Sequence, residues 1–216
     1  MGVALKGGHN AEHHNHNDVG SFVVARAGQT PLVDPGSETY TARTFSSRRY
    51  ESGVLNSWGH PVPRVAGKLQ RTGRAAAAKV LRTEFTDQAD TLVLDLRAAY
   101  AVEGLKKLQR TFVYSREGQG SLTVTDEVEL DSPQEFGTAL ITFSKWTRTK
   151  EGGLLVGSGP GAVRVEMSAE GGKLKPADEE IEEDCHGGHH PTRLGFDLAE
   201  PVTKATITAT IRPAAE

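Results

Sequence analysis

The chain has 216 residues, 37% of them hydrophobic, which is enough to bury a core of its own. Its formal net charge of −3 leaves no basic stripe, so we expect no nucleic acid among its partners. No stretch approaches the roughly 20 consecutive apolar residues of a membrane span, and the polar, histidine-rich start is unlike a signal peptide. We therefore expect one domain over residues 1–216, with no membrane partner.

Short segments rich in Val, Leu, Thr and aromatic residues recur along the chain, separated by Gly, Pro and Asp/Ser turns. This pattern predicts an all-β fold, a two-layer antiparallel β-sandwich. Helical signals are few, and the best case is the alanine run within Gly73–Val80, which indicates a short helix. In chain order, the expected strands are Ser21–Ala27, Lys79–Thr86, Thr91–Ala99, Leu105–Ser115, Ser121–Leu130, Glu135–Thr142, Val163–Ser168 and Thr203–Arg212.

The alternation of apolar and polar residues is clearest over residues 121–130, where Asp126 is the exception on the inward face. The glycine-containing segment Arg116–Gly120 before this strand is typical of a hairpin turn. Residues 170–193 have low apolar content, several glycines and the acidic run Asp178–Asp184. That composition predicts a mobile loop.

Histidines are concentrated just before the first expected strand, in GGHNAEHHNHNDVGSF (residues 7–22). If the chain is extended there, His14 and His16 project from one face, so the pair can converge on one ion. Imidazoles and a carboxylate suit zinc and related divalent ions, and the remaining ligands must come from later in the chain. Asp34 in PLVDPG and His60 in NSWGHP are the obvious candidates.

A second group of potential ligands lies near the C-terminus, in CHGGHH (residues 185–190). Thiolate and imidazole groups can bind a second metal. The flanking sequence is acidic and reads as a flexible loop, which favours the simpler interpretation of solvated side chains.

The motifs resemble those of the heparinase II/III-like family, because HNHNDVGSF, DPG, Tyr50 and NSWGHPVP occur in the order typical of that family. Residues 100–130 also look like its core sandwich. The resemblance implies the C-terminal β-sandwich domain of α/α-toroid polysaccharide lyases. It further implies that His16, Asp34 and His60 hold zinc. His14 would face the substrate cleft, and Tyr50 matches a tyrosine near the sugar in some alginate-lyase relatives, so these two are the catalytic candidates.

Such lyases cleave uronate-containing polysaccharides by β-elimination: a base removes the proton α to the carboxylate, and an acid helps the 4-linked sugar leave. The resemblance therefore implies an anionic polysaccharide as substrate and a periplasmic or secreted protein. Arg43, Arg48 and Arg49 offer cations to a uronate. Complete family members place an α/α-toroid domain before the sandwich. We expect this chain to need such a domain, or a second copy in a homo-oligomer, and to show weak or no turnover alone.

Two other functions fit the same residues. The first is a non-catalytic carbohydrate-binding or assembly module that keeps zinc for structure. The second is a cupin-like metalloenzyme, since HxH followed by a later His on a β fold also describes that class. It ranks last, because Asp18 and Ser21 stand where a cupin would carry a Glu shortly after HxH.

Overall fold

The computed structural model describes residues 1–185 and 187–214, and strands make up nearly all of its regular structure. The strands are β1 Gly2–Leu5, β2 His9–Asn10, β3 Phe22–Arg26, β4 Gln29–Leu32, β5 Arg64–Val65, β6 Gly73–Ala77, β7 Lys79–Phe85, β8 Ala89–Asp95, β9 Leu105–Ser115, β10 Ser121–Gln134, β11 Phe136–Thr142, β12 Trp146–Arg148, β13 Leu154–Val156, β14 Val163–Glu170, β15 Leu174–Glu180, β16 Thr192–Leu198 and β17 Val202–Pro213. The helical segments are single 3-10 turns, η1 Arg49–Glu51, η2 Ser57–Gly59, η3 Arg97–Ala99 and η4 Gly159–Gly161. None of the described helices is long and apolar enough to cross a membrane.

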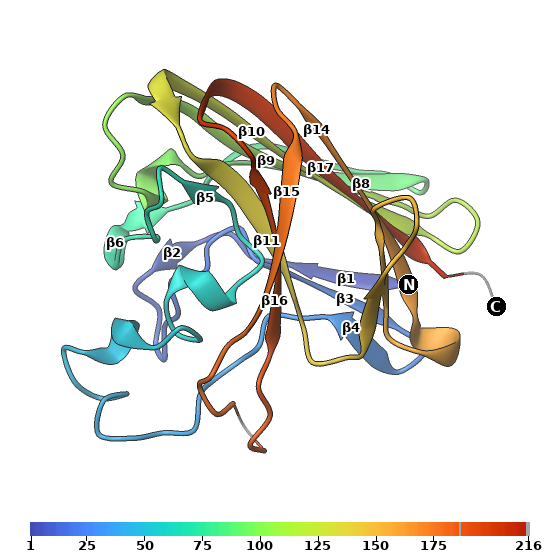
Figure 1. Ribbon diagram of the computed structural model, residues 1–216, viewed down its shortest axis with the longest axis horizontal. Coiled ribbons are helices and arrows are strands. Elements are labelled where there is room, and N and C mark those ends of the chain that lie inside the picture. Colours follow the sequence, from blue (N-terminus) through green and yellow to red (C-terminus); the bar gives the residue numbers. More distant parts are fainter. Residues whose placement is uncertain (186, 215–216) are drawn as a thin grey trace.

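The strands form antiparallel sheets that enclose one main core (Figure 1). The largest sheet has eight strands in the order β12-β13-β14-β17-β10-β9-β8-β7, and a second has the order β15-β16-β11-β5. Their inward side chains, such as Val124 and Ile207 from the first and Leu140 and Phe196 from the second, belong to the same apolar cluster. Strands β1-β3-β4 close one side of this core through Phe22. The predicted all-β sandwich is therefore confirmed.

The inward face of strand β10 is apolar except for the carboxylate of Asp126, which has a partner on the neighbouring strand. Its residues alternate between half-buried and buried from Ser121 to Leu130, as predicted. Asp126 is buried and accepts hydrogen bonds from Nε and Nη2 of Arg110 on β9, both at 2.6 Å. The exposed fractions of the two side chains are only 1% and 2%, so the pair lies inside the sandwich. A buried charge of this kind is tolerated because its partner and further hydrogen bonds compensate for lost water.

The remaining donors of Arg110 reach three other segments. Its Nη1 donates to the carbonyl oxygens of Gly20 at 2.7 Å and Pro61 at 2.5 Å, and its Nη2 donates to Thr138 Oγ1 at 2.9 Å. One guanidinium thus ties two loops to β9, β10 and β11. The Gly20 loop carries His16 and the Pro61 loop carries His60, so Arg110 holds both histidines against the sandwich.

Two expectations about local structure were wrong. Residues Gly73–Ala77 form β6, paired with β2, although alanine favours a helix. Intrinsic propensity is a weak signal in so short a segment, and pairing with β2 outweighs it. Within residues 170–193, expected to be a loop, Leu174–Glu180 form β15. It pairs along its whole length with β16 at the sheet edge, where a strand can stay polar on both faces because few of its side chains are covered.

Asp126→Ala should lower the free energy of unfolding by about 3–5 kcal/mol, because it leaves the buried guanidinium of Arg110 without its counter-charge. Urea denaturation followed by tryptophan fluorescence measures this change. The next residue, Glu127, pairs with Lys107 at 2.8 Å on the half-exposed face and supplies the matched control. Glu127→Ala should cost less than about 1 kcal/mol, and equal losses for the two variants would contradict the prediction.

Candidate metal centre

Four potential ligand residues from three separate segments converge beside the sandwich. His16, Asp18, Asp34 and His60 each offer one ligand atom, and these atoms all lie within 4.8 Å of one another. Bonds to a single ion are about 2.0–2.2 Å long, so its ligand atoms lie at most about 4.4 Å apart, and this group would have to close slightly around an ion. The structure therefore brings together His16, Asp34 and His60, and adds Asp18. This group could hold a metal ion.

The β3–β4 hairpin positions the carboxylate of Asp34. The two strands pair with Val24 opposite Leu32, so the residue before β3 lies beside the residues that follow β4. Ser21 Oγ accordingly donates to Asp34 Oδ2 at 2.6 Å. The Gly36 amide donates a long hydrogen bond, 3.4 Å, to Asp34 Oδ1.

Turn η2 positions His60. Asn56 caps this turn, because its Oδ1 accepts a hydrogen bond from the Trp58 amide at 2.8 Å. A side chain at Gly59 would meet the Gly53 carbonyl oxygen at 2.4 Å, so only glycine allows the two segments to pass this closely. His60 follows directly and has no exposed surface.

Backbone and side-chain hydrogen bonds hold the segment that carries His16 and Asp18. The Asn17 amide donates to the Leu55 carbonyl at 3.0 Å, which joins this segment to the one before η2. Asp18 accepts from Lys6 Nζ at 2.5 Å. Asp18 was missed as a candidate ligand, although its i, i+2 spacing from His16 was a usable signal.

Electrostatics within the group favour an ionised carboxylate beside imidazoles. Burial and the neighbouring His60 lower the pKa of the His16 imidazole to about 4, so that ring is neutral at neutral pH, as a metal ligand must be. Burial would raise the pKa of Asp34, but His60 and the hydrogen bond from Ser21 hold that pKa well below its usual range. Burial likewise opposes protonation of His60, yet the Asp34 carboxylate raises its pKa.

One buried atom of the group has no partner. His60 Nδ1 lies 2.9 Å from Asp34 Oδ2, but within the described residues His60 Nε2 is buried without a hydrogen bond. A buried polar atom left unpaired costs free energy, so this nitrogen calls for a ligand that the protein itself does not supply. The residues therefore fit a divalent metal ion.

The two catalytic candidates lie outside this group. The chain turns at His14, whose φ is +54°, so the expected extended segment with His14 and His16 on one ion was wrong. His14 is exposed. Tyr50 in η1 is half-buried, and its hydroxyl accepts a hydrogen bond from Asn15 Nδ2 at 3.1 Å. Arg49 also holds Asn15, because its Nη2 donates to the Asn15 carbonyl oxygen at 2.9 Å.

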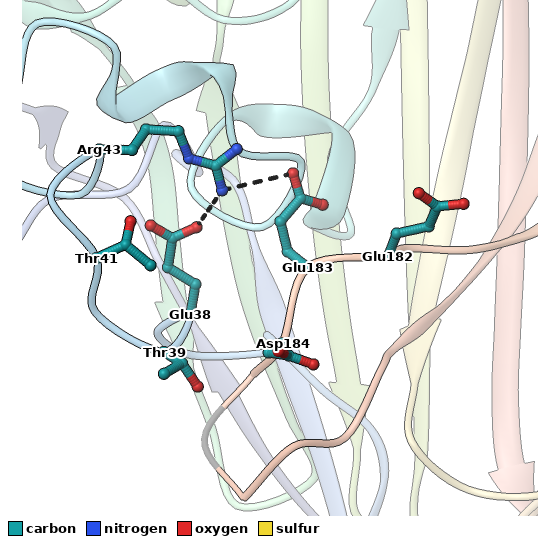
Figure 2. A pocket seen from close by; sticks show the side chains of 7 residues that line it. All are labelled: Glu38, Thr39, Thr41, Arg43, Glu182, Glu183 and Asp184. Carbon is teal, nitrogen blue, oxygen red and sulfur yellow. Dashed lines mark hydrogen bonds and ion pairs between the residues drawn. The ribbon is translucent and has the colours of Figure 1, made fainter.

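A polar cleft lies between the Asp34–Tyr50 loop and the connection after β15, and the charged side chains that line it join the two segments (Figure 2). Arg43 Nη2 pairs with Glu38 at 2.8 Å and lies 3.8 Å from Glu183, as the dashed lines in Figure 2 show. Glu183 in turn accepts from the Gly53 amide at 2.8 Å. Arg43 is therefore committed to this junction, whereas Arg48 forms only an exposed ion pair with Glu51 at 2.7 Å.

The second histidine group shows no comparable arrangement. His186 lies outside the described residues. Cys185 is buried, and His190 places its ring nitrogens 3.2 Å from Glu180 and 2.9 Å from Asp184. Among the described residues of this segment, none joins a group of potential metal ligands.

Solved structures of similar fold come from heparinases. A heparinase III gene product with methylated lysines aligns over 99% of this chain and 32% of its own, with a TM-score of 0.79 and 15% identity. A crystal structure of heparinase III aligns over 93% of this chain and 30% of its own, with a TM-score of 0.70 and 18% identity. Heparan sulfate lyase HepC from Pedobacter heparinus aligns over 99% of this chain and 33% of its own, with a TM-score of 0.65 and 14% identity. At these identities the likeness shows a shared fold.

This chain spans about a third of the length of each of those structures. The comparison with curated proteins finds no match. The family model described as "Heparinase II/III-like, C-terminal" matches residues 1–202, which include the whole of the candidate metal centre. The resemblance seen in the sequence motifs is thereby confirmed, and the chain belongs to the heparinase II/III-like C-terminal family.

Proposed function

We propose that this chain is the zinc-binding β-sandwich of a lyase that cleaves a uronate-containing, anionic polysaccharide by β-elimination. The observation that carries the proposal is the buried convergence of His16, Asp34 and His60 beside the segment that bears His14. Membership of the heparinase II/III-like family supports the reaction class. Because the chain spans about a third of its solved relatives, a second domain would supply the rest of the cleft.

In this proposal His16, Asp34 and His60 bind the zinc, and Asp18 lies close enough to be a fourth ligand. Imidazole and carboxylate ligands suit that ion. Bound zinc would supply a fixed positive charge that cross-links the three segments. The role of the chain's own residues is to hold Asn15 and His16 still, so that the exposed His14 keeps a constant position.

His14 and Tyr50 are the groups that would exchange protons with the sugar. They come from different segments, and Asn15 joins them, since it follows His14 in the chain and donates to the Tyr50 hydroxyl at 3.1 Å. In a β-elimination one group must take the α-proton and another must protonate the leaving oxygen. An imidazole and a phenol on one surface can divide these roles.

His16→Ala should abolish stoichiometric zinc binding, because it removes one of the buried imidazoles. Elemental analysis of the purified protein measures the metal content, and thermal unfolding with and without added zinc gives an independent readout. At free zinc about 100 times the dissociation constant, binding should stabilise the native protein by about 2.7 kcal/mol.

His13→Ala is the matched control, since His13 is an exposed imidazole in the same segment. It should leave zinc content and the zinc-dependent stabilisation unchanged. If the wild-type protein held no zinc and gained no stability from it, or if the His16 variant bound zinc as well as the control, the metal assignment would fail.

The catalytic assignment is tested in a longer protein that carries this domain together with an α/α-toroid. Digestion of alginate, heparan sulfate and related polymers should generate the ultraviolet absorbance of an unsaturated uronate. His14→Ala with Tyr50→Phe should lower kcat by about 10²-fold or more, the size of a general acid–base contribution. His13→Ala should not.

Full activity of the double variant would remove His14 and Tyr50 from the mechanism. Hydrolysis or oxidation would give products without the new double bond. Such products would exclude β-elimination. Zinc binding without turnover in any such longer protein would favour the non-catalytic carbohydrate-binding module.

A further inference from the structure

Strand β7 is an open edge of the eight-stranded sheet. It ends the strand order, and its only partner in that order is β8. Every residue of β7 is exposed, including three large apolar ones: Val80 at 54%, Leu81 at 48% and Phe85 at 73%. An exposed apolar edge strand without proline is a template for pairing with another strand. The bulge between Val80 and Arg82 shields only its first half, and Arg82–Phe85 pair regularly with β8.

The two faces of β7 differ in character. Thr83 pairs with Leu92, which packs on the core, so Thr83 and its same-face neighbour Phe85 point toward the core side of the sheet, whereas the bulge interrupts this alternation at Leu81. Arg82 and Glu84 point to the opposite face, where they form an ion pair with each other. A partner strand must therefore match an apolar face and a charged face at once.

A second copy of β7 meets both requirements in one register. In a two-fold antiparallel pair, directly opposite residues share a face, so each register is centred on one residue. Centring on Thr83 places Arg82 opposite Glu84 of the other copy, twice, and brings Phe85 alongside the bulged Leu81 of the other copy. Centring on Arg82 or on Glu84 instead places like charges opposite each other, which is unfavourable.

We propose that two copies of this chain associate through antiparallel pairing of their β7 strands, in the register centred on Thr83. The pairing continues the sheet across the two-fold axis, from β8 and β7 of one copy to β7 and β8 of the other. The contact involves about five residues per copy and is small for a protein interface, so the dimer is weak and depends on concentration.

Sedimentation equilibrium of this chain over the micromolar range tests the proposal, with charge reversal as the probe of register. Arg82→Glu alone and Glu84→Arg alone each place like charges opposite each other at two positions, and each should weaken dimerisation by about 10-fold or more. The double variant restores opposite charges and should dimerise nearly as the wild type does. These side chains are exposed, so circular dichroism should show the same fold throughout.

Cysteine cross-linking gives a second, independent readout. Thr83→Cys should form an intermolecular disulfide with itself under mild oxidation, because directly opposite Cβ atoms in a sheet lie about 4.5–5.5 Å apart, close to disulfide spacing. Thr203→Cys, exposed on β17, is the matched control and should stay monomeric on denaturing gels. The native Cys185 is buried and should not compete.

A monomer at every concentration would overturn the proposal and leave this edge to another part of a longer chain. A dimer that ignores both single charge reversals, or one that the double variant fails to restore, would place the interface elsewhere. Equal cross-linking at positions 83 and 203 would do the same. None of these readouts depends on zinc or on lyase activity.

Discussion

The buried ion pair between Arg110 and Asp126 is the contact on which both the sandwich and the candidate metal centre depend. Two charges removed from water are costly, and this cost is offset only if every donor finds an acceptor. Arg110 meets that condition by using carbonyl oxygens of Gly20 and Pro61, which lie next to the ligand-bearing segments. The sequence neighbours of these carbonyls, Asp18 and His60, are thereby placed within one small volume.

Two of the candidate ligands, Asp34 and His60, closely follow an element whose position is fixed by other contacts. Asp34 follows β4 and is aligned by hairpin register with Ser21. His60 follows a capped turn that passes close to Gly53. Backbone contacts thus bring the ligands together from the polypeptide alone, and a metal ion would bind to a site that is largely formed.

Much of this fold is predictable from the sequence, since periodicity reports burial directly. The strand over residues 121–130 and its hairpin were predicted correctly, and so was the inward position of Asp126. Its partner Arg110 was not predicted, because register between strands is a tertiary property. Strand β15 was missed for a related reason: it is held by backbone pairing at an edge, and its side chains carry no apolar signal. Family motifs named three candidate ligands, and the spacing of Asp18 from His16 could have added a fourth, while the turn at His14 required coordinates.

The candidate metal ligands and the two proposed proton-transfer groups beside them differ in their access to solvent. His60 has no exposed surface and His16 is 8% exposed, whereas His14 is exposed and Tyr50 half-buried. A catalytic metal keeps a coordination position open to substrate, and a structural one is enclosed by its ligands. The enclosure of His16 and His60 therefore favours an architectural ion, with proton transfer left to the more exposed pair. Asn15 joins the two sets of residues, because it precedes His16 in the chain and binds the Tyr50 hydroxyl. Displacement of His16 would therefore be felt at the proposed proton-transfer groups without any contact between metal and substrate.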